Sequence, residues 1–255
     1  MKLEIKLADV RSLETDLLVV NLFQGVTVPG GATGAVNVLL DGVISDLIQA
    51  GEITGRQNEI TLIHTFGKIP AKRIAVLGLG SRDAFSSQVI RQGMGALVRY
   101  ASARNIVNIT TIAHGAGIGG MDPEESARAV AEGACLGAYR FSKYKTQGSD
   151  PVVESLDIVD SSADKIDSLN QGMNLGKVLA ESTNIARDLG NEPANILSPV
   201  ELALRAKAIC ESVGIEFQDF GREEAFNLGM GAFLSVAAGS EQPPRFIIMK
   251  YSGDP

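Results

Sequence analysis

The feature that most constrains the fold is a long helical pattern that two prolines interrupt in the last third of the chain. The pattern runs from about Ile166 to Leu189 and starts again at Pro199. Pro193 cannot continue a helix, whereas Pro199 suits a first turn, where its missing N–H would have no partner. The break predicts two domains and a connecting helix, over residues 1–162, 163–190 (the linker helix) and 191–255 (the beginning of the second domain, expected to be truncated).

Strand and helix patterns alternate through the first domain. Asp16–Phe23 is almost wholly apolar, as in a central strand, whereas Lys2–Leu7 alternates charged and apolar residues, as in a half-buried strand. The alternation predicts an α/β domain with helices on both faces of its sheet. The other expected strands are Glu59–Thr65, Arg73–Leu79, Ile106–Ala113 and Val152–Val159, and the expected helices are Gly34–Ala50, one that includes Ile90–Ala101, and Pro123–Arg140.

The second domain has fewer predicted elements. A helix is expected at Pro199–Val213 and a final strand at Arg245–Tyr251. Between them we expect a short strand at Ile215–Phe217 and a short helix at Glu223–Asn227. These patterns predict a partial α/β domain.

Charge and composition exclude several classes of protein. The net charge is −7 and the basic residues form no cluster, so neither nucleic acid nor an anionic membrane is an expected partner. Cys135 and Cys210 lie far apart without metal-ligand spacing, which indicates a reducing compartment and buried thiols. No secretory signal is visible, and no apolar run approaches the roughly 20 residues of a membrane span. We expect a soluble, cytoplasmic protein.

The chain has few residues suited to catalysis. The two histidines, His64 and His114, belong to no His-Glu-x-x-His motif, and no Cys-x-x-Cys motif occurs. A serine triad would need a histidine, and no Gly-x-Ser-x-Gly elbow is present. The residues by themselves therefore predict no catalytic residue and no metal ligand.

One glycine-rich loop follows the strand expected at Ile106–Ala113. Gly115, Gly117 and Gly120 have the spacing G-x-G-x-x-G, and backbone amides at such a place can cradle a phosphate. The next helix, however, starts with acidic residues that would repel an anion, and no acidic residue ends a strand about 20 positions later. A flexible turn is the preferred interpretation.

A second glycine loop contains Gly30, Gly31 and Gly34. It lacks the Gly-Lys-Ser/Thr ending of a P-loop, so no lysine is placed to meet a phosphate. A tight connection in which Thr33 caps the following helix explains the loop without a ligand.

Four segments of the chain carry a resemblance to a known family. They are Pro29–Val36, Glu132–Phe141 with Tyr144 and Lys145, Asn184–Pro199, and Leu228–Val236 with Gly239 and Ser240. The second and third are specific sequences, whereas glycine runs alone are common. In these segments, and in their order, the chain resembles the leucyl (cytosol) aminopeptidases, which are di-metal exopeptidases.

The resemblance implies a two-domain subunit. The family's N-terminal domain is a macro-domain-like mixed sheet flanked by helices that helps to build a hexamer, and its catalytic domain holds two zinc or manganese ions. The metal ligands lie in Gly-Lys-Gly-x-Thr-Phe-Asp-Ser-Gly-Gly and Asn-Thr-Asp-Ala-Glu-Gly-Arg segments, and neither occurs between Met1 and Pro255. We expect the parent protein to remove N-terminal residues from peptides. This chain by itself is expected to be inactive and to hold no metal ion.

Two other functions stay open at this point. The first domain could bind ADP-ribose or another nucleotide through the loops at Gly30–Gly34 and Gly115–Gly120, because α/β proteins bind ligands at strand ends. Alternatively, the domain could serve only to assemble an oligomer.

Overall fold

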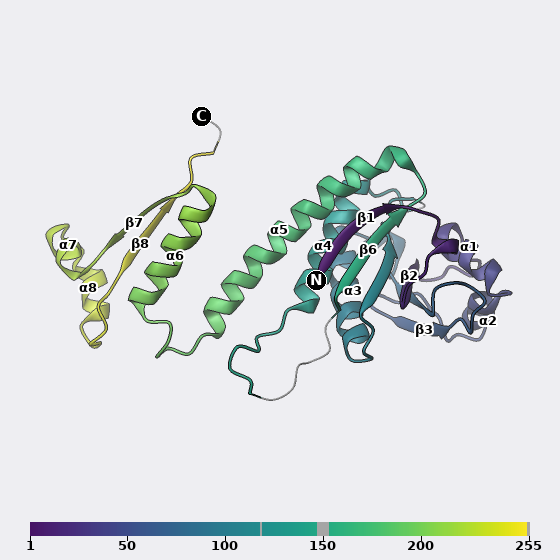
Figure 1. Cartoon of the computed structure of the whole chain (residues 1–255), viewed down its shortest axis with the longest axis horizontal. Coiled ribbons are helices and arrows are strands. Elements are labelled where there is room, and N and C mark those ends of the chain that lie inside the picture. The colour runs from purple at the N-terminus through teal and green to yellow at the C-terminus, as the bar shows by residue number, and fades with distance from the viewer. Residues whose placement is uncertain (118, 147–152, 254–255) are drawn as a thin grey trace. The chain divides into compact units, whose positions relative to one another are not determined.

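The chain forms two compact units, Met1–Asn184 and Ile185–Pro255, and each is described by itself (Figure 1). The structure is a computed structural model that describes residues 1–117, 119–146 and 153–253. The first unit holds a six-stranded sheet and the second a two-stranded sheet. Both units therefore combine strands with helices, as the sequence predicts.

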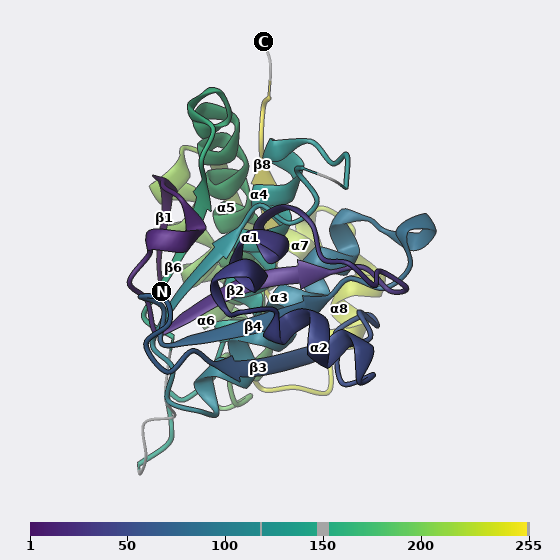
Figure 2. The ribbon, with the colours of Figure 1, turned by 90° about the vertical axis from the view of Figure 1, so that its right-hand side faces the viewer.

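The sheet of the first unit has the strand order β1-β6-β5-β2-β4-β3 (Figure 2). Neighbouring strands are parallel except β3 and β4, which are antiparallel, so the sheet is mixed. The predicted strand Lys2–Leu7 is confirmed with the same bounds, and the other predicted strands are confirmed with shorter bounds. Val152 lies outside the described residues. The strands are β1 (Lys2–Leu7), β2 (Leu17–Leu22), β3 (Ile60–His64), β4 (Arg73–Gly78), β5 (Asn108–Ile112) and β6 (Ser155–Asp160).

Helices cover both faces of this sheet. Side chains alternate along the buried strand β2, so that Leu17 and Val19 join one apolar cluster while Leu18 and Val20 join another. The first cluster lies under α3 (Ser87–Ser102), α4 (Pro123–Ala138) and α5 (Ile166–Asn191). The second lies under α1 (Gly31–Leu39) and α2 (Val43–Gln49). Because β2 is buried on both sides, its sequence shows no polar alternation.

The predicted single helix at Gly34–Ala50 is wrong, because two helices occupy this region. Asp41 and Gly42 separate α1 from α2 with φ values of 55° and 88° in the left-handed region, which a continuing helix cannot contain. The predicted capping role of Thr33 is also wrong. Gly30 is the N-cap of α1, and the Thr33 hydroxyl instead donates a hydrogen bond to the Asn21 carbonyl at 2.7 Å.

Glycines allow α3, α4 and α5 to pack closely. A Cβ at Gly133 of α4 would lie 2.3 Å from the Arg91 carbonyl oxygen of α3, and one at Gly137 would lie 2.6 Å from that of Gly95. A Cβ at Gly172 of α5 would lie 2.0 Å from the Glu124 carbonyl oxygen of α4. These distances are far below van der Waals contact, so the glycines in Glu132–Phe141 serve helix packing.

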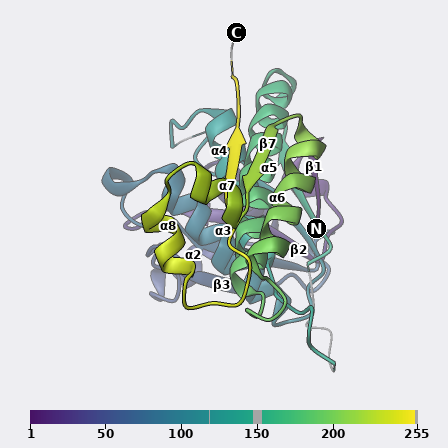
Figure 3. The same cartoon turned by 90° about the vertical axis from the view of Figure 1, so that its left-hand side faces the viewer.

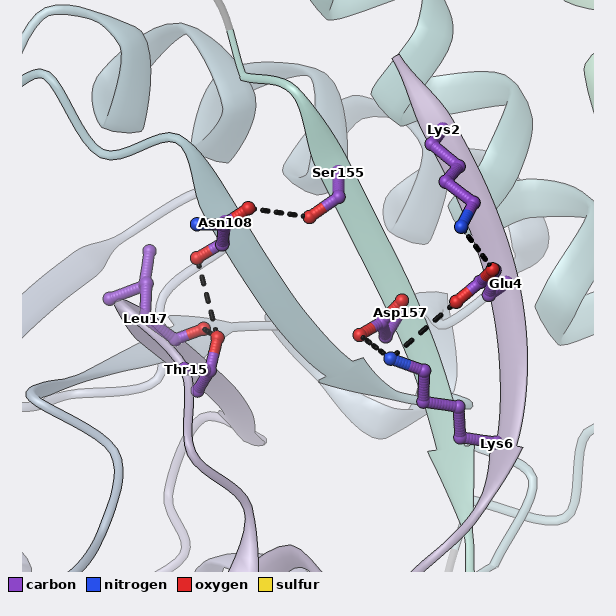
Figure 4. A network of polar contacts seen from close by, with 8 residues as sticks. All are labelled: Lys2, Glu4, Lys6, Thr15, Leu17, Asn108, Ser155 and Asp157. Carbon is purple, nitrogen blue, oxygen red and sulfur yellow. Dashed lines mark hydrogen bonds and ion pairs between the residues drawn. The ribbon is translucent and has the colours of Figure 1, made fainter.

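One face of the β1-β6-β5 region is polar (Figure 4). Lys6 Nζ lies 2.6 Å from an Asp157 carboxylate oxygen, and Lys2 Nζ lies 2.6 Å from a Glu4 oxygen. Ser155 donates a hydrogen bond of 2.8 Å to the side chain of Asn108. The alternate residues of β1, such as Leu3 and Ile5, pack against the apolar cluster on the opposite face. The alternation predicted for Lys2–Leu7 is thus confirmed.

The second unit contains the end of α5, two paired strands and the helices α6, α7 and α8, of which α7 and α8 lie between the two strands in the chain (Figure 3). Pro199 occupies the first turn of α6, as predicted, and Ser198 caps this helix by accepting a hydrogen bond from the Glu201 amide. The prediction omitted α8, and it made β7 too short. The elements are α6 (Pro199–Val213), β7 (Glu216–Phe220), α7 (Arg222–Asn227), α8 (Gly231–Ala237) and β8 (Phe246–Lys250), and β7 pairs with β8 in antiparallel fashion.

A membrane-spanning helix must be both long and apolar. No single described helix meets both requirements, whereas the bent pair α1 and α2 meets them together by length and composition alone.

Candidate ligand-binding cavity

A cavity of about 440 Å³ lies in the first unit, beyond the carboxyl ends of its parallel strands. The residues that follow four of these strands line it, namely Ala8 after β1, Phe23 after β2, Ala113 after β5 and Ser161 after β6. Strand β2 has β4 on one side and β5 on the other, and the helices that follow β2 and β5 cover opposite faces of the sheet. Such a switch point is where open α/β sheets form a crevice.

The two glycine loops predicted from the sequence meet at this cavity. Gly30 and Gly31 of one loop and Gly115 and Gly117 of the other line it. Gly119, which the sequence did not single out, also belongs to the lining, whereas Gly34 and Gly120 do not. A Cβ at Gly34 would lie 2.6 Å from the Pro29 carbonyl oxygen, so Gly34 serves the tight turn of its own loop.

Three basic side chains line the cavity, and each comes from a short 3-10 turn. Arg11 follows β1, Arg82 follows β4 and Lys165 follows β6. Arg11 Nε donates to both carboxylate oxygens of Asp9 at 2.9 Å, and these hydrogen bonds lower the pKa of Asp9 to about 2. Lys165 Nζ lies 3.6 Å from Asp160. The charges of Asp9 and Asp160 are therefore balanced by Arg11 and Lys165.

Arg82 differs from the other two cations. Its guanidinium lies 5.0 Å from the centroid of the Phe23 ring, a cation–π contact. Among the described residues, Arg82 has no carboxylate partner. Arg82 thus brings an uncompensated positive charge to the cavity lining.

A buried histidine orients an amide toward the cavity. His114 is fully buried, and this burial lowers its pKa to about 4, so the ring is neutral at pH 7. Its Nδ1 lies 3.0 Å from Asn21 Oδ1 and its Nε2 lies 2.9 Å from Thr111 Oγ1. An amide oxygen can only accept, so Nδ1 carries the proton and Nε2 accepts from the threonine hydroxyl. Asn21 lines the cavity, and its amide nitrogen has no hydrogen-bond partner among the described residues.

The first turn of α1 adds backbone donors. Its N-cap, Gly30, has no side chain that could accept a hydrogen bond. The first backbone bond of the helix runs from Gly34 N to Gly30 O, and the amides of Gly31, Ala32 and Thr33 have no acceptor among the described residues. All three residues line the cavity. The cavity therefore offers several hydrogen-bond donors.

Chemically, this arrangement suits binding of an acceptor-rich ligand. In the part of the chain that the structure describes, no three His, Cys, Asp or Glu side chains are grouped so that they could hold a metal ion. The described residues thus do not fit the two metal ions that the family resemblance implies, and we derive no catalytic step through metals from them. The sequence analysis did not group the three cations with Asn21 and His114. These residues are far apart in the chain: Asn21 and His114, for example, are 93 positions apart.

The two cysteines lie outside this cavity, in helices. Cys135 in α4 is partly buried, and burial raises the pKa of its thiol. Cys210 in α6 is buried. Both thiols are free, and the prediction of buried thiols is confirmed for Cys210 but not for Cys135, which is only partly buried.

Comparison with known proteins gives two family matches. Residues 19–148 match the model of the cytosol aminopeptidase family, N-terminal domain, and residues 184–255 match that of the cytosol aminopeptidase family, catalytic domain. The probable cytosol aminopeptidase of Alkaliphilus metalliredigens is 34% identical over 256 residues, covering 99% of this chain and 51% of the relative. That of Geobacter sulfurreducens is 32% identical over 256 residues, with coverages of 99% and 51%. The chain spans about half the length of these curated relatives.

Solved structures share the fold. A mutant of tomato leucine aminopeptidase matches with a TM-score of 0.81 at 23% identity, over 97% of this chain and 50% of that chain. The bottromycin maturation enzyme BotP in complex with Mn matches with a TM-score of 0.73 at 22% identity, over 93% of this chain and 45% of that chain.

Proposed function

The chain belongs to the cytosol aminopeptidase family, and we propose that it supplies the N-terminal domain and the first part of the catalytic domain of a leucyl aminopeptidase. The parent protein would release N-terminal residues from peptides in the cytoplasm. The observation that carries this proposal is the order of the two family matches along the chain, at residues 19–148 and 184–255.

Within the parent protein, we assign this chain a role in scaffolding and in assembly of a hexamer. Two apolar clusters give the first unit its own core on both faces of the sheet, which suits a rigid scaffold. The zinc or manganese ions and their ligands would belong to the part of the family's catalytic domain that this chain does not span. The hexamer is an expectation from the family, and light scattering of the parent protein would test it.

The first test concerns activity. The purified chain, supplied with Mn²⁺, is expected to show no hydrolysis of leucyl p-nitroanilide above a blank without protein, because the described residues group no metal ligands. Initial rates with Mn²⁺, with Zn²⁺ and with EDTA provide the measurement. Metal-dependent turnover that scales with the concentration of the chain and disappears in EDTA would refute the predicted inactivity of this chain.

The exposed apolar residues of the second unit support the proposal that it is part of a larger catalytic fold. Phe226, Leu228 and Val236 are 74%, 61% and 86% exposed. Among the described residues of this unit, the hydrophobic residues classed as buried are Ala203, Cys210 and Ala225, which are small. Such a unit buries little apolar surface and is expected to have low stability by itself.

This difference between the units can be measured by hydrogen exchange. Amides of β7 and β8 are expected to exchange at least tenfold faster than those of β2, because local opening of a poorly buried strand pair costs less free energy. The β2 amides serve as the internal control, since both faces of that strand are covered. Equal protection of the three strands would show that the second unit is a stable domain by itself.

A further inference from the structure

We propose that the cavity of the first unit binds a phosphorylated ligand of the nucleoside diphosphate class, with its phosphates at the first turn of α1. This proposal goes beyond the proposed peptidase function and does not depend on it. The cavity volume of about 440 Å³ lies within the range in which proteins hold small organic ligands, roughly 300–1,000 Å³.

Helix capping decides which of the two glycine loops receives the phosphates. At the start of α4, Asp122 accepts hydrogen bonds from the amides of Glu124 and Glu125 at 2.9 and 3.2 Å. Those amides are occupied, and the Asp122 carboxylate would repel an anion. The start of α1 has neither feature, since its N-cap is Gly30 and its first-turn amides have no acceptor among the described residues. Free amides at a helix N-terminus favour an anion.

Two side chains add to this anion site. The guanidinium of Arg82 carries an uncompensated charge and can pair with phosphate oxygens. The Asn21 amide nitrogen lacks a partner among the described residues, and the hydrogen bond between Asn21 Oδ1 and His114 holds the amide in one orientation. Because His114 is neutral, it fixes Asn21 as a donor without adding charge. Helix, guanidinium and amide thus all offer donors to the same cavity.

The rest of the lining explains why an organic group is expected in addition to phosphate. Apolar side chains, including Val10, Val26, Ile112 and Val159, contribute to the cavity wall, together with the ring of Phe23. Inorganic phosphate would leave these surfaces without contacts, whereas a base and sugar would cover them. The carboxylates of Asp9 and Asp160 are acceptors for sugar hydroxyls at the same cavity.

The test is calorimetric titration of the full chain with ADP, ADP-ribose, inorganic phosphate and adenosine. Binding of ADP or ADP-ribose at least tenfold tighter than that of phosphate and of adenosine is expected. In NMR spectra, ADP is expected to shift the amides of Gly31, Ala32 and Thr33 more than those of Glu124 and Glu125. No heat with millimolar ADP and ADP-ribose, or phosphate binding as tight as ADP, would overturn the proposal.

Two variants locate the site. Arg82→Gln is expected to weaken ADP binding roughly tenfold, because it removes one charge-assisted contact. Arg104→Gln is the matched control, because Arg104 also lies over an aromatic ring, that of Tyr100, but does not line the cavity.

Asn21→Asp keeps the oxygen that accepts a hydrogen bond from His114 and replaces the amide donor with a negative charge, so measurable ADP binding should be lost. Unchanged affinity in both cavity variants, with melting curves that show folded protein, would exclude this site.

Discussion

Replacing Gly172 by alanine is expected to lower the free energy of unfolding by about 3 kcal/mol. The new Cβ would lie 2.0 Å from the Glu124 carbonyl oxygen, which belongs to the backbone of the helix packed against it. No rotamer change can relieve contact between a Cβ and a backbone oxygen, so α4 and α5 must separate and lose apolar contacts. Urea denaturation followed by circular dichroism measures the change.

Another glycine in the same helix provides the control. Nothing lies within 4 Å of a Cβ placed at Gly190. Gly190→Ala is therefore expected to leave stability unchanged or to raise it by up to about 1 kcal/mol, because alanine has the higher helix propensity. Similar losses in the two variants would show that the spacing of α4 and α5 does not depend on Gly172.

Lowering the pH from 7 to 4 is expected to remove about 3 kcal/mol of stability through His114 alone. Its pKa is about 4 in the folded protein, because burial disfavours the charged ring, and about 6.5 in the unfolded chain. Between these values the unfolded state binds a proton that the folded state does not. This contribution is therefore fully present above pH 6.5 and is lost as the pH falls toward 4.

The variant His114→Gln tests this expectation. It should have a flatter dependence of unfolding free energy on pH between 6.5 and 4, although it starts from a lower stability because Thr111 and Asn21 lose a partner. His64→Gln is the control, since His64 is an exposed residue of β3. Urea titrations at several pH values supply the data. Parallel profiles for the wild type and His114→Gln would contradict a neutral, buried His114.

Elements with strong local signals were predicted well from the sequence. The bounds of α6 were predicted correctly because Ser198 and Pro199 provide a cap and a first turn, and Gly214 ends the helix with a φ of 72°. Strand β2 was predicted because burial on both faces requires a continuous apolar run. The break between α1 and α2 was missed, since Asp41 and Gly42 also fit within a longer amphipathic pattern.

The sequence predicted the glycine loops of the candidate site but not its charged and amide side chains. Both glycine loops were visible, because glycine at strand ends is a local signal. The cations were not, because Arg11, Arg82 and Lys165 are brought together only by the crossover connections of the sheet. The orientation of Asn21 depends on His114, 93 residues away. A close approach such as that of Gly172 to Glu124 likewise depends on tertiary packing, which no local pattern encodes.

Strand β1 has a consequence for assembly. It forms one edge of the large sheet, where unpaired backbone groups could recruit a strand from another copy. Lysines and glutamate along β1 discourage such strand addition, because a matching copy would bring like charges into register. Copies of this domain are therefore expected to associate through helices or loops, and each sheet stays confined to its own subunit.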